Sequence, residues 1–331
     1  MAEITIALAG NPNSGKTTLF NAFTGARQHV GNYPGITVEK KEGLFVHNDR
    51  HFRLIDLPGT YSLTAYSMEE VVARDFLVQE KPVAVIDIVD AANLERNLYL
   101  TIQLMELGAP VILALNMVDA AARRGIFIDT EKLGRLLGMP VVATVARKGE
   151  GTAALAETAI EIVSGGGRQQ TPAVISYGTD VDSALDDMSA TIEAAGFLTD
   201  LYPARWIALK YAEGDTAVRK LGLERDPRLS DALSAKVSAL ADHLKQTMDL
   251  SPNAVIADHR YGYIRSLLRQ GVIAVRPDPD RLFLSDRLDQ VLTHRLAGPL
   301  IMLLVVWALS VHLCLECGAG RLARGPVRPA G

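Results

Sequence analysis

The chain has 331 residues, of which 48% are hydrophobic and 22% are charged, with a formal net charge of −4 at pH 7. This balance is typical of a folded protein long enough for two domains, and it excludes a disordered or low-complexity chain. The slightly acidic charge argues against a nucleic-acid surface, and two cysteines are too few for a disulfide framework.

Up to about residue 165, apolar strands alternate with amphipathic helices, which predicts a doubly wound α/β sheet with ligands bound beyond the carboxyl ends of its strands. A further strand at 39–47 is expected to pair with 50–56 at the sheet edge. The other predicted strands are 4–9, 53–56, 83–89, 111–116 and 141–144, and the predicted helices are 16–24, 69–79, 94–107, 130–137 and 152–163.

The second half of the chain has a different periodicity. Residues 164–172 read S-G-G-G-R-Q-Q-T-P, which is a linker by composition. The pattern after it is helical near 181–195, 202–213, 230–248 and 253–270, so we expect a compact helical domain. The predicted boundaries are a first domain at 1–165, a linker at 166–172, a helical domain at 173–272 and a second linker at 273–295.

Residues 296–315 form a run without Lys, Arg, Asp or Glu. Twenty such residues in a helix span about 30 Å, the thickness of the hydrocarbon core of a bilayer. The run therefore predicts a transmembrane helix, with a buried C-terminal helix as the alternative. Arginines flank the run on both sides, so the charge bias gives no orientation. The tail at 316–331 is rich in Gly, Arg and Pro.

Residues 10–17 read G-N-P-N-S-G-K-T between the first strand and the first helix, and they fit G-x-x-x-x-G-K-[ST] at every fixed position. Gly10 and Gly15 let backbone amides turn toward phosphate groups, Lys16 supplies a cation, and the Thr17 hydroxyl can ligate Mg²⁺. The alternative, a glycine-rich turn without a ligand, is disfavoured by this strand–helix context. The expected nucleotide contacts in this P-loop are Gly10, Asn11, Pro12, Asn13, Ser14, Gly15, Lys16, Thr17 and Thr18.

Two further motifs distinguish GTP from ATP. D-L-P-G follows a strand, and in it Asp56 would reach Mg²⁺ through water while the Gly59 amide would contact the γ-phosphate. N-M-V-D ends another strand, and its carboxylate, Asp119, can accept hydrogen bonds from guanine N1–H and the 2-amino group. Adenine offers neither donor, so a buried carboxylate would be left unpaired and ATP would be rejected. Asn116 is expected to brace the neighbouring loops.

Two less specific elements complete the set. Thr37, in G-I-T-V before the strand at 39–47, is expected to ligate Mg²⁺ and to close over the γ-phosphate when GTP is bound. The Ala146 amide, in T-V-A-R-K-G-E-G, is expected to contact guanine O6. The catalytic group would then comprise Asn13, Lys16, Thr37 and Gly59. The remaining expected nucleotide contacts are Gly35, Ile36, Val38, Met117, Val145 and Arg147.

Together the motifs predict an α/β P-loop GTPase fold of the Ras-like kind, with a mixed sheet flanked by helices, then a small all-α domain and a C-terminal hydrophobic helix. Thr60 stands where many GTPases have a water-positioning glutamine. Catalysis must therefore depend on backbone groups, a bound cation or a partner's residue.

At this point the sequence resembles the FeoB family of bacterial ferrous iron transport proteins. The resemblance is carried by the P-loop and the helix after it, by V-G-N-Y-P-G-I-T-V-E-K-K-E-G, by L-I-D-L-P-G-T-Y-S-L, by D-H-R-Y-G-Y-I at 258–264, and by S-D-R-L-D-Q-V-L-T-H-R-L-A-G-P-L. It covers roughly residues 3–312.

The resemblance implies a cytoplasmic G domain and a helical domain that restrains GDP release, preceding a membrane region that transports Fe²⁺ across the bacterial inner membrane. It also implies K⁺-stimulated GTP hydrolysis with Asn13 as a K⁺ ligand, since a cation near the phosphates can replace the charge of an arginine finger. The tail at 316–331 departs from the family pattern, and we expect a truncated or frameshifted gene end.

Two alternatives stay open at this stage, together with homo-oligomerisation. One is a membrane-tethered regulatory GTPase without transport activity, and the other is a soluble K⁺-dependent GTPase of RNA or ribosome maturation. The second predicts a basic RNA-binding appendage, and the chain has a net charge of −4. The pair Cys314 and Cys317 has metal-site spacing, but a single C-x-x-C is a weak signal and an incidental pair is the better interpretation.

Overall fold

The structure is a computed structural model that describes residues 4–25, 28–33, 37–64, 67–164, 173–276, 292–293, 295 and 297–322. It divides into two compact units, Met1–Arg276 and Pro277–Gly331. The predicted nucleotide contacts Gly35 and Ile36 lie outside the described residues.

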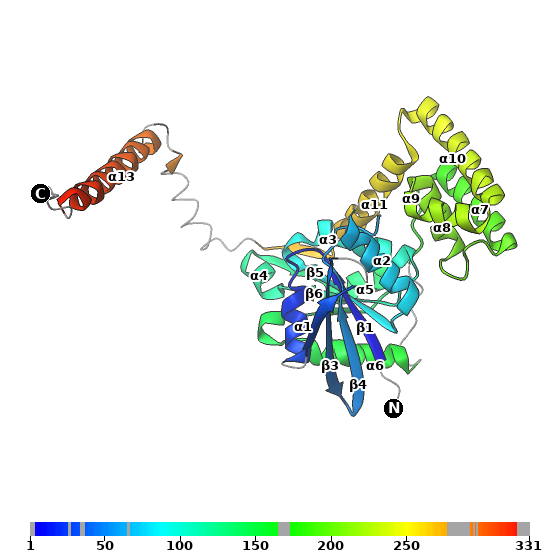
Figure 1. The fold of residues 1–331 in the computed structure, drawn as a ribbon, viewed down its shortest axis with the longest axis horizontal. Coiled ribbons are helices and arrows are strands. Elements are labelled where there is room, and N and C mark those ends of the chain that lie inside the picture. The colour runs from blue at the N-terminus through cyan, green and yellow to red at the C-terminus, as the bar shows by residue number, and fades with distance from the viewer. Residues whose placement is uncertain are drawn as a thin grey trace, which may run out of the picture. The chain divides into compact units, whose positions relative to one another are not determined.

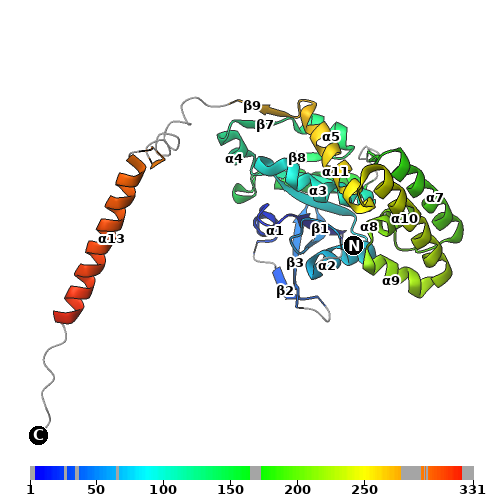
Figure 2. The same cartoon turned by 90° about the horizontal axis from the view of Figure 1, so that it is seen from above.

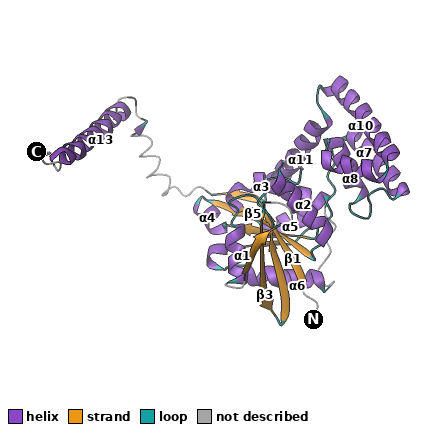
Figure 3. Cartoon of the chain, in the orientation of Figure 1, coloured by secondary structure: helices purple, strands orange, loops and turns teal. Residues whose placement is uncertain are grey.

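The first unit is built on a seven-stranded sheet with the order β2-β3-β4-β1-β5-β6-β8 (Figures 1 and 3). Strands β4, β1, β5, β6 and β8 are parallel, whereas β2 and β3 add antiparallel pairs, so the sheet is mixed as predicted. The strands are β1 (Ile4–Gly10), β2 (Gln28–Asn32), β3 (Glu39–His47), β4 (Arg50–Asp56), β5 (Ala84–Asp90), β6 (Val111–Asn116) and β8 (Val141–Ala143).

Continuous apolar runs explain the central strands. All six residues of β6 are buried, as are all but the last residue of β5, which is the pattern of parallel strands covered on both faces. One apolar core lies under α1 and α6, and another lies under α2, α3 and α5. The flanking helices are α1 (Lys16–Thr24), α2 (Met68–Glu80), α3 (Leu94–Glu106), α4 (Val118–Arg123), α5 (Thr130–Leu137) and α6 (Thr152–Val163).

The helical domain shares the second of these cores, so its apolar residues are continuous with those of the G domain. Two of its helices begin at aspartate caps: Asp215 accepts from the amides of Ala217 and Val218, and Asp226 precedes Pro227. The helices are α7 (Thr179–Ala195), α8 (Ala204–Glu213), α9 (Thr216–Arg225), α10 (Pro227–Met248) and α11 (Pro252–Arg269). The sequence pattern did not predict α9, because only Val218 and Gly222 of this helix are buried.

Residues 273–275, which the sequence pattern placed in the second linker, form a strand instead. This strand, β9 (Ile273–Val275), pairs antiparallel with β7 (Ile126–Ile128), and Figure 2 shows both strands close to α4. Three residues are too few for a periodic signal, so neither strand is visible in the sequence alone. The first compact unit consequently extends to Arg276.

The second unit contains α13 (Ala297–Leu322), where Leu300 and the apolar residues from Met302 to Val311 are exposed. Within the part of the chain that the structure describes, no helix combines the length and apolar character needed to cross a membrane. The membrane helix expected at 296–315 stays a prediction, since Leu296 and the side chains beyond Val311 lie outside the described residues.

A buried acid on β5 generates a first prediction. Asp87 is 1% exposed, and burial raises the pKa of its carboxyl group to about 7, although a hydrogen bond from the Thr101 hydroxyl at 2.6 Å acts to lower the pKa. The unfolded chain releases this proton near pH 4 whereas the folded protein keeps it to about pH 7, so stability falls as pH rises between these values.

Relative to Asp87→Asn, the wild-type free energy of unfolding should fall by about 1.4 kcal/mol per pH unit in this window and then level off. Urea titrations of both proteins from pH 5 to pH 8 check this, and parallel curves would contradict it.

Candidate functional site

The P-loop connects β1 to α1 at the carboxyl edge of the sheet, and its backbone requires glycine at Gly15. This residue has φ +95°, and a Cβ added there would lie 2.2 Å from Nδ2 of Asn116. The loop therefore approaches the end of β6 more closely than any side chain would allow. Asn11 and Ser14 are buried, whereas Pro12, Asn13, Thr17 and Thr18 are exposed.

Asn13 lies at the exposed turn of the loop in a left-handed conformation, with φ 67°. Asparagine adopts this conformation more readily than most residues with a side chain. Asn13 is exposed, and its amide oxygen is a neutral, hard oxygen ligand. Such an oxygen fits an alkali ion. A residue that does not adopt the left-handed conformation readily would disturb the turn.

Lys16 and Asp56 bring opposite charges together at the centre of the site. Nζ of Lys16 donates to Oδ1 of Asp56 at 2.5 Å, and the two side chains are 11% and 5% exposed. Burial raises the pKa of Asp56, and the Lys16 ammonium group opposes this shift. The pair thus places a cation suited to phosphate and a carboxylate suited to hydrated Mg²⁺ within one hydrogen bond of each other.

The loop after β4 packs against the P-loop. The Thr60 amide donates to the Gly10 carbonyl at 3.3 Å, and a Cβ added at Gly59 would lie 3.5 Å from Pro12. Thr60 is buried, so it does not extend into solvent as a water-orienting side chain would. Thr37 is exposed just before β3, and the Val38 carbonyl accepts from the Tyr33 amide at 3.0 Å.

Asn116 is the residue that joins the phosphate-binding and base-binding loops. Its Nδ2 donates to the Ser14 carbonyl at 2.9 Å, and its Oδ1 accepts from the Ala146 amide at 3.0 Å and from the Thr144 hydroxyl at 3.3 Å. The residue is 2% exposed, so these bonds are shielded from water. Because the Ala146 amide already bonds Asn116, its contact with guanine O6 stays a prediction.

Asp119 lies in the first turn of α4, after Met117, which has φ 61°. Its Oδ2 accepts from Nη1 of Arg123 at 3.0 Å and lies 3.6 Å from Nη2 of Arg147. The hydrogen bond from Arg123 lowers the pKa of Asp119, so the group is an ionised acceptor at neutral pH. Val145 is buried beside it, and its amide donates to the Glu150 carbonyl at 3.1 Å.

Two family models match the chain in tandem. Residues 4–159 match the model of ferrous iron transport protein B, and residues 177–273 match the model of the FeoB cytosolic helical domain. The chain belongs to the FeoB family. This assignment favours neither a GTPase of RNA or ribosome maturation nor a regulatory GTPase without transport activity.

Curated FeoB relatives are similar over nearly the whole chain. An Fe(2+) transport protein A/Fe(2+) transporter FeoB fusion protein of Porphyromonas gingivalis is 43% identical over 306 residues, which are 91% of this chain and 36% of the relative. The Fe(2+) transporter FeoB of Staphylococcus aureus is 38% identical over 301 residues, which are 91% of this chain and 43% of the relative. The chain thus spans less than half the length of these two proteins.

Solved FeoB structures confirm the fold of the first unit. The cytosolic domain of L. pneumophila FeoB has a TM-score of 0.69 at 38% identity, and the match covers 82% of this chain and 99% of that one. An S. thermophilus NFeoB mutant bound to mGDP has a TM-score of 0.72 at 36% identity, with 81% and 99% covered. The T. maritima cytosolic domain in its GMPPNP form has a TM-score of 0.67 at 35% identity, with 82% and 99% covered.

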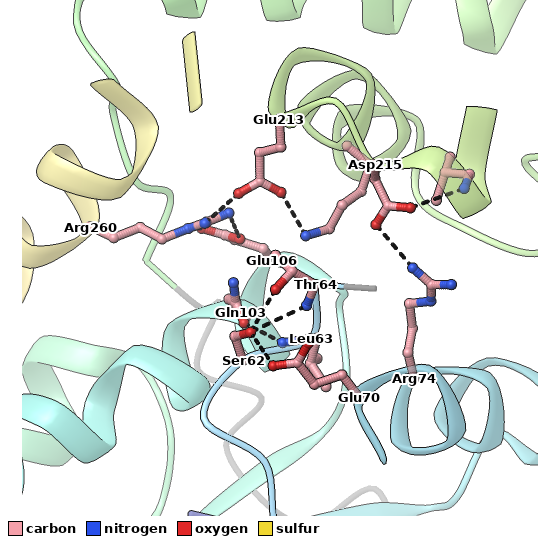
Figure 4. A network of polar contacts seen from close by, with 12 residues as sticks. Ser62, Leu63, Thr64, Glu70, Arg74, Gln103, Glu106, Glu213, Asp215 and Arg260 are labelled. Atoms are coloured by element: carbon pink, nitrogen blue, oxygen red, sulfur yellow. Dashed lines mark hydrogen bonds and ion pairs between the residues drawn. The ribbon is translucent and has the colours of Figure 1, made fainter. Parts of the chain in front are cut away.

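Buried ion pairs connect the FeoB G domain to its helical domain (Figure 4). Arg74 on α2 donates to Asp215 at 3.0 Å, and both side chains are 2% exposed. Arg260 on α11 bonds Glu106 on α3 at 2.7 and 2.8 Å, and it also bonds Glu213. Burial acts to lower the pKa of Arg260, but the two carboxylates outweigh it and keep the guanidinium charged. The helical domain therefore bonds α2 through Asp215 and α3 through Arg260, and Glu213 bonds the same arginine.

The loop of the D-x-x-G motif joins this network. The Leu63 amide donates to Oε1 of Gln103 on α3 at 2.5 Å, and the Ser62 hydroxyl donates to Glu70 on α2 at 2.6 Å (Figure 4). Ser67 and Glu70 form a capping box that starts α2. Ser62, Leu63 and Gln103 belong to no sequence motif that predicts these contacts, whereas the S-x-x-E spacing of Ser67 and Glu70 is a readable signal for the start of α2.

A comparison of two substitutions tests the role of Asn116. Asn116→Ala leaves the Ser14 carbonyl and the Ala146 amide unpaired in a dry site, so it should lower the free energy of unfolding by on the order of 3 kcal/mol. Asp119→Ala removes only partly exposed contacts and should leave the unfolding free energy nearly unchanged. Urea unfolding in the absence of nucleotide checks both. Equal stability of the two variants would show that Asn116 has no bracing role.

Proposed function

We propose that this chain is the GTP-hydrolysing cytoplasmic part of a bacterial Fe²⁺ uptake transporter, located on the cytoplasmic side of the inner membrane. The observation that carries this proposal is the placement of Asp119, an ionised acceptor, three residues after Asn116, whose side chain is hydrogen-bonded to the phosphate loop at Ser14. A carboxylate in that relation to a P-loop selects guanine over adenine. The solved relatives named with mGDP and GMPPNP support the same nucleotide.

The donor set fits Mg²⁺ together with a nucleoside triphosphate. Thr17 is exposed beside Lys16 at the start of α1, and Asp56 is directed toward the same point from β4. Hydroxyl and carboxylate oxygens are the ligands that Mg²⁺ takes when it shares a phosphate. Thr17, Thr37 and Asp56 would hold this ion, which neutralises charge on the β- and γ-phosphates, while Lys16 would bind the phosphate oxygens.

Hydrolysis by this site would depend on backbone groups and a monovalent cation. Thr60 is buried with its amide bonded to Gly10, so the Gly59 amide and Thr37 are the groups left to orient the attacking water. Asn13 offers its amide oxygen from the exposed turn of the P-loop. It would hold K⁺, whose charge supports the transition state where other GTPases use an arginine.

Fe²⁺ is the cargo in this proposal, and the nucleotide cycle regulates its passage through the membrane region of the longer transporter. The Gly59 loop continues to Ser62 and Leu63, which bond α2 and α3. Helix α2 reaches the helical domain through the pair of Arg74 and Asp215, and α3 reaches it through the pair of Glu106 and Arg260. Movement of the loop would thereby reach the helical domain.

The cation requirement has a direct test. Asn13→Ala should lower K⁺-stimulated GTP turnover by about tenfold or more, since it removes a ligand of the ion that supplies transition-state charge. Turnover of wild type, this variant and Asn253→Ala, an exposed control in the helical domain, is measured in matched K⁺ and Na⁺ buffers with Mg²⁺. Equal wild-type turnover in the two salts, or unchanged K⁺ stimulation in Asn13→Ala, would refute the assignment. The choice of nucleotide is tested separately by measuring the affinities for GTP and ATP. We expect the chain to bind GTP tightly and to reject ATP.

The pair of Arg74 and Asp215 supports a second test. Arg74→Met leaves the buried Asp215 carboxylate without a cation and should cost about 3 kcal/mol of unfolding free energy. Asp215→Asn should cost less, because Arg74 keeps the partly exposed Asp75 at 3.5 Å. The double variant should cost less than the sum, because neither charge then stays unpaired. If the pair connects α2 to the helical domain, the single variants should also change the rate of GDP release. Additive losses with an unchanged release rate would count against this connection.

A further inference from the structure

The short sheet of β7 and β9 joins the segment after α4 to the last residues of the first compact unit. Ile126, Phe127 and Ile128 oppose Val275, Ala274 and Ile273. Backbone hydrogen bonds close the ladder at both ends. The Arg276 amide donates to the Gly125 carbonyl at 2.7 Å, and the Asp129 amide donates to the Val272 carbonyl at 2.9 Å. The β9 strand is thus bonded to a partner strand that lies only a few residues after Asp119.

Helix α4 transmits the position of this ladder to Asp119. The helix has six residues, and the amides of Ala120 and Ala121 bond the Met117 carbonyl at its start. At its end the Gly125 amide donates to the Ala122 carbonyl at 3.0 Å, and the Gly125 carbonyl accepts from Arg276. A continuous series of backbone hydrogen bonds therefore runs from Met117 to β9. The side chain of Arg123, in the last turn, also bonds Asp119.

The start of α4 is fixed by the core, whereas its end depends on the ladder. Ala121 is 1% exposed, and Val118 packs against the larger apolar core. The ladder is only partly buried: Ile126, Ile128 and Ile273 pack at the edge of the larger apolar core, whereas Phe127 and Val275 are 46% and 65% exposed. The Arg276 guanidinium covers the Phe127 ring at 5.8 Å from the ring centroid. An isolated two-stranded ladder is marginally stable, so this one can open without unfolding the sheet.

A groove beneath the ladder leaves its other face loosely packed. The groove has a volume of about 500 Å³ and is lined by Ile126, Ile273 and Val275 from the ladder, with Tyr261 and Leu268 from α11. Figure 2 shows β7 and β9 beside α4 and α11. The apolar face of the ladder therefore does not fix β9 as tightly as a packed core would. The backbone hydrogen bonds therefore act together with the partial packing of Ile126, Ile128 and Ile273 on the core.

We propose that the β7–β9 ladder is a positioning element of the guanine site. When the ladder is closed, α4 is fixed at both ends and Asp119 faces the base. When it opens, the end of α4 is released and the hold on guanine weakens. This inference rests on the proposed binding of guanine at Asp119. A displacement of the chain beyond Arg276 would therefore act on Asp119 through the ladder. Because coupling between two sites is reciprocal, guanine binding would in turn favour the closed ladder.

Substitutions at Ala274 test the proposal in the full chain. The hydrogen bonds at the ends of the ladder make Phe127 and Ala274 a hydrogen-bonded pair, so Ala274→Pro removes a donor from the centre of the ladder. Ala274 is exposed, and Ala274→Ser keeps the donor as a matched control. Fluorescent GDP should leave Ala274→Pro about fivefold faster or more than it leaves Ala274→Ser, the low end of ordinary coupling between sites.

Inosine diphosphate separates a positioning role from general loosening. It lacks the 2-amino group and so makes one hydrogen bond fewer to Asp119 than GDP does. If the ladder positions Asp119, Ala274→Pro should weaken GDP more than inosine diphosphate and reduce the ratio of their affinities. An unchanged release rate and ratio would overturn the inference while leaving the proposed function intact. Failure of the wild-type chain to bind GDP would instead overturn the proposed function.

A reversible cross-link covers the case in which Ala274→Pro does not fold. Ile126 and Val275 oppose each other across the ladder, at a separation that suits a disulfide. Ile126→Cys with Val275→Cys is made in a chain carrying Cys314→Ser and Cys317→Ser, which removes both natural cysteines. The oxidised protein should release GDP more slowly than the same protein after reduction. Equal rates in the two states would overturn the inference.

Discussion

The buried side chain of Asn116 is the contact on which the nucleotide site depends. One amide group donates to the phosphate loop at Ser14 and accepts from the base-binding loop at Ala146, at the end of a strand that is buried throughout. Gly15 must be a glycine for this contact to form, because any Cβ would occupy the place of the amide. The two halves of the site are therefore built around a single side chain, and the sheet supplies its fixed position.

Charge is handled differently in the two buried networks of the first unit. Lys16 and Asp56 bond each other, yet both belong to groups that phosphate and Mg²⁺ would engage, so their pairing is exchangeable. Arg260, by contrast, is bonded by two carboxylates and by the Tyr99 hydroxyl. A buried guanidinium satisfied in this way favours one arrangement of the surrounding helices. Lys16 and Asp56 can thus exchange partners, while Arg260 at the junction with the helical domain keeps its two carboxylates.

Much of the fold could be predicted from the sequence because the relevant signals are local. The apolar runs of β5 and β6 and the order of the P-loop, D-L-P-G and N-M-V-D each lie within a few residues. The elements that the sequence did not predict are very short or depend on contacts between distant residues. Strands β7 and β9 have three residues each, and the pair of Arg74 and Asp215 joins residues 141 positions apart. Neither periodicity nor motif spacing reports such contacts, since they exist only once the helical domain packs on the G domain.

The turn Glu213–Gly214–Asp215 has a consequence for how this family can be recombined. Its two acids bond Arg260 on α11 and Arg74 on α2, and Gly214 between them has φ 77°, a left-handed conformation that favours glycine. The spacing of one residue sets the distance between the two contacts, so an insertion here would break one of them. Chimaeras that exchange helical domains between relatives should consequently transfer the turn intact, together with the basic residue on α2 that Asp215 bonds and the acidic residue on α3 that Arg260 bonds.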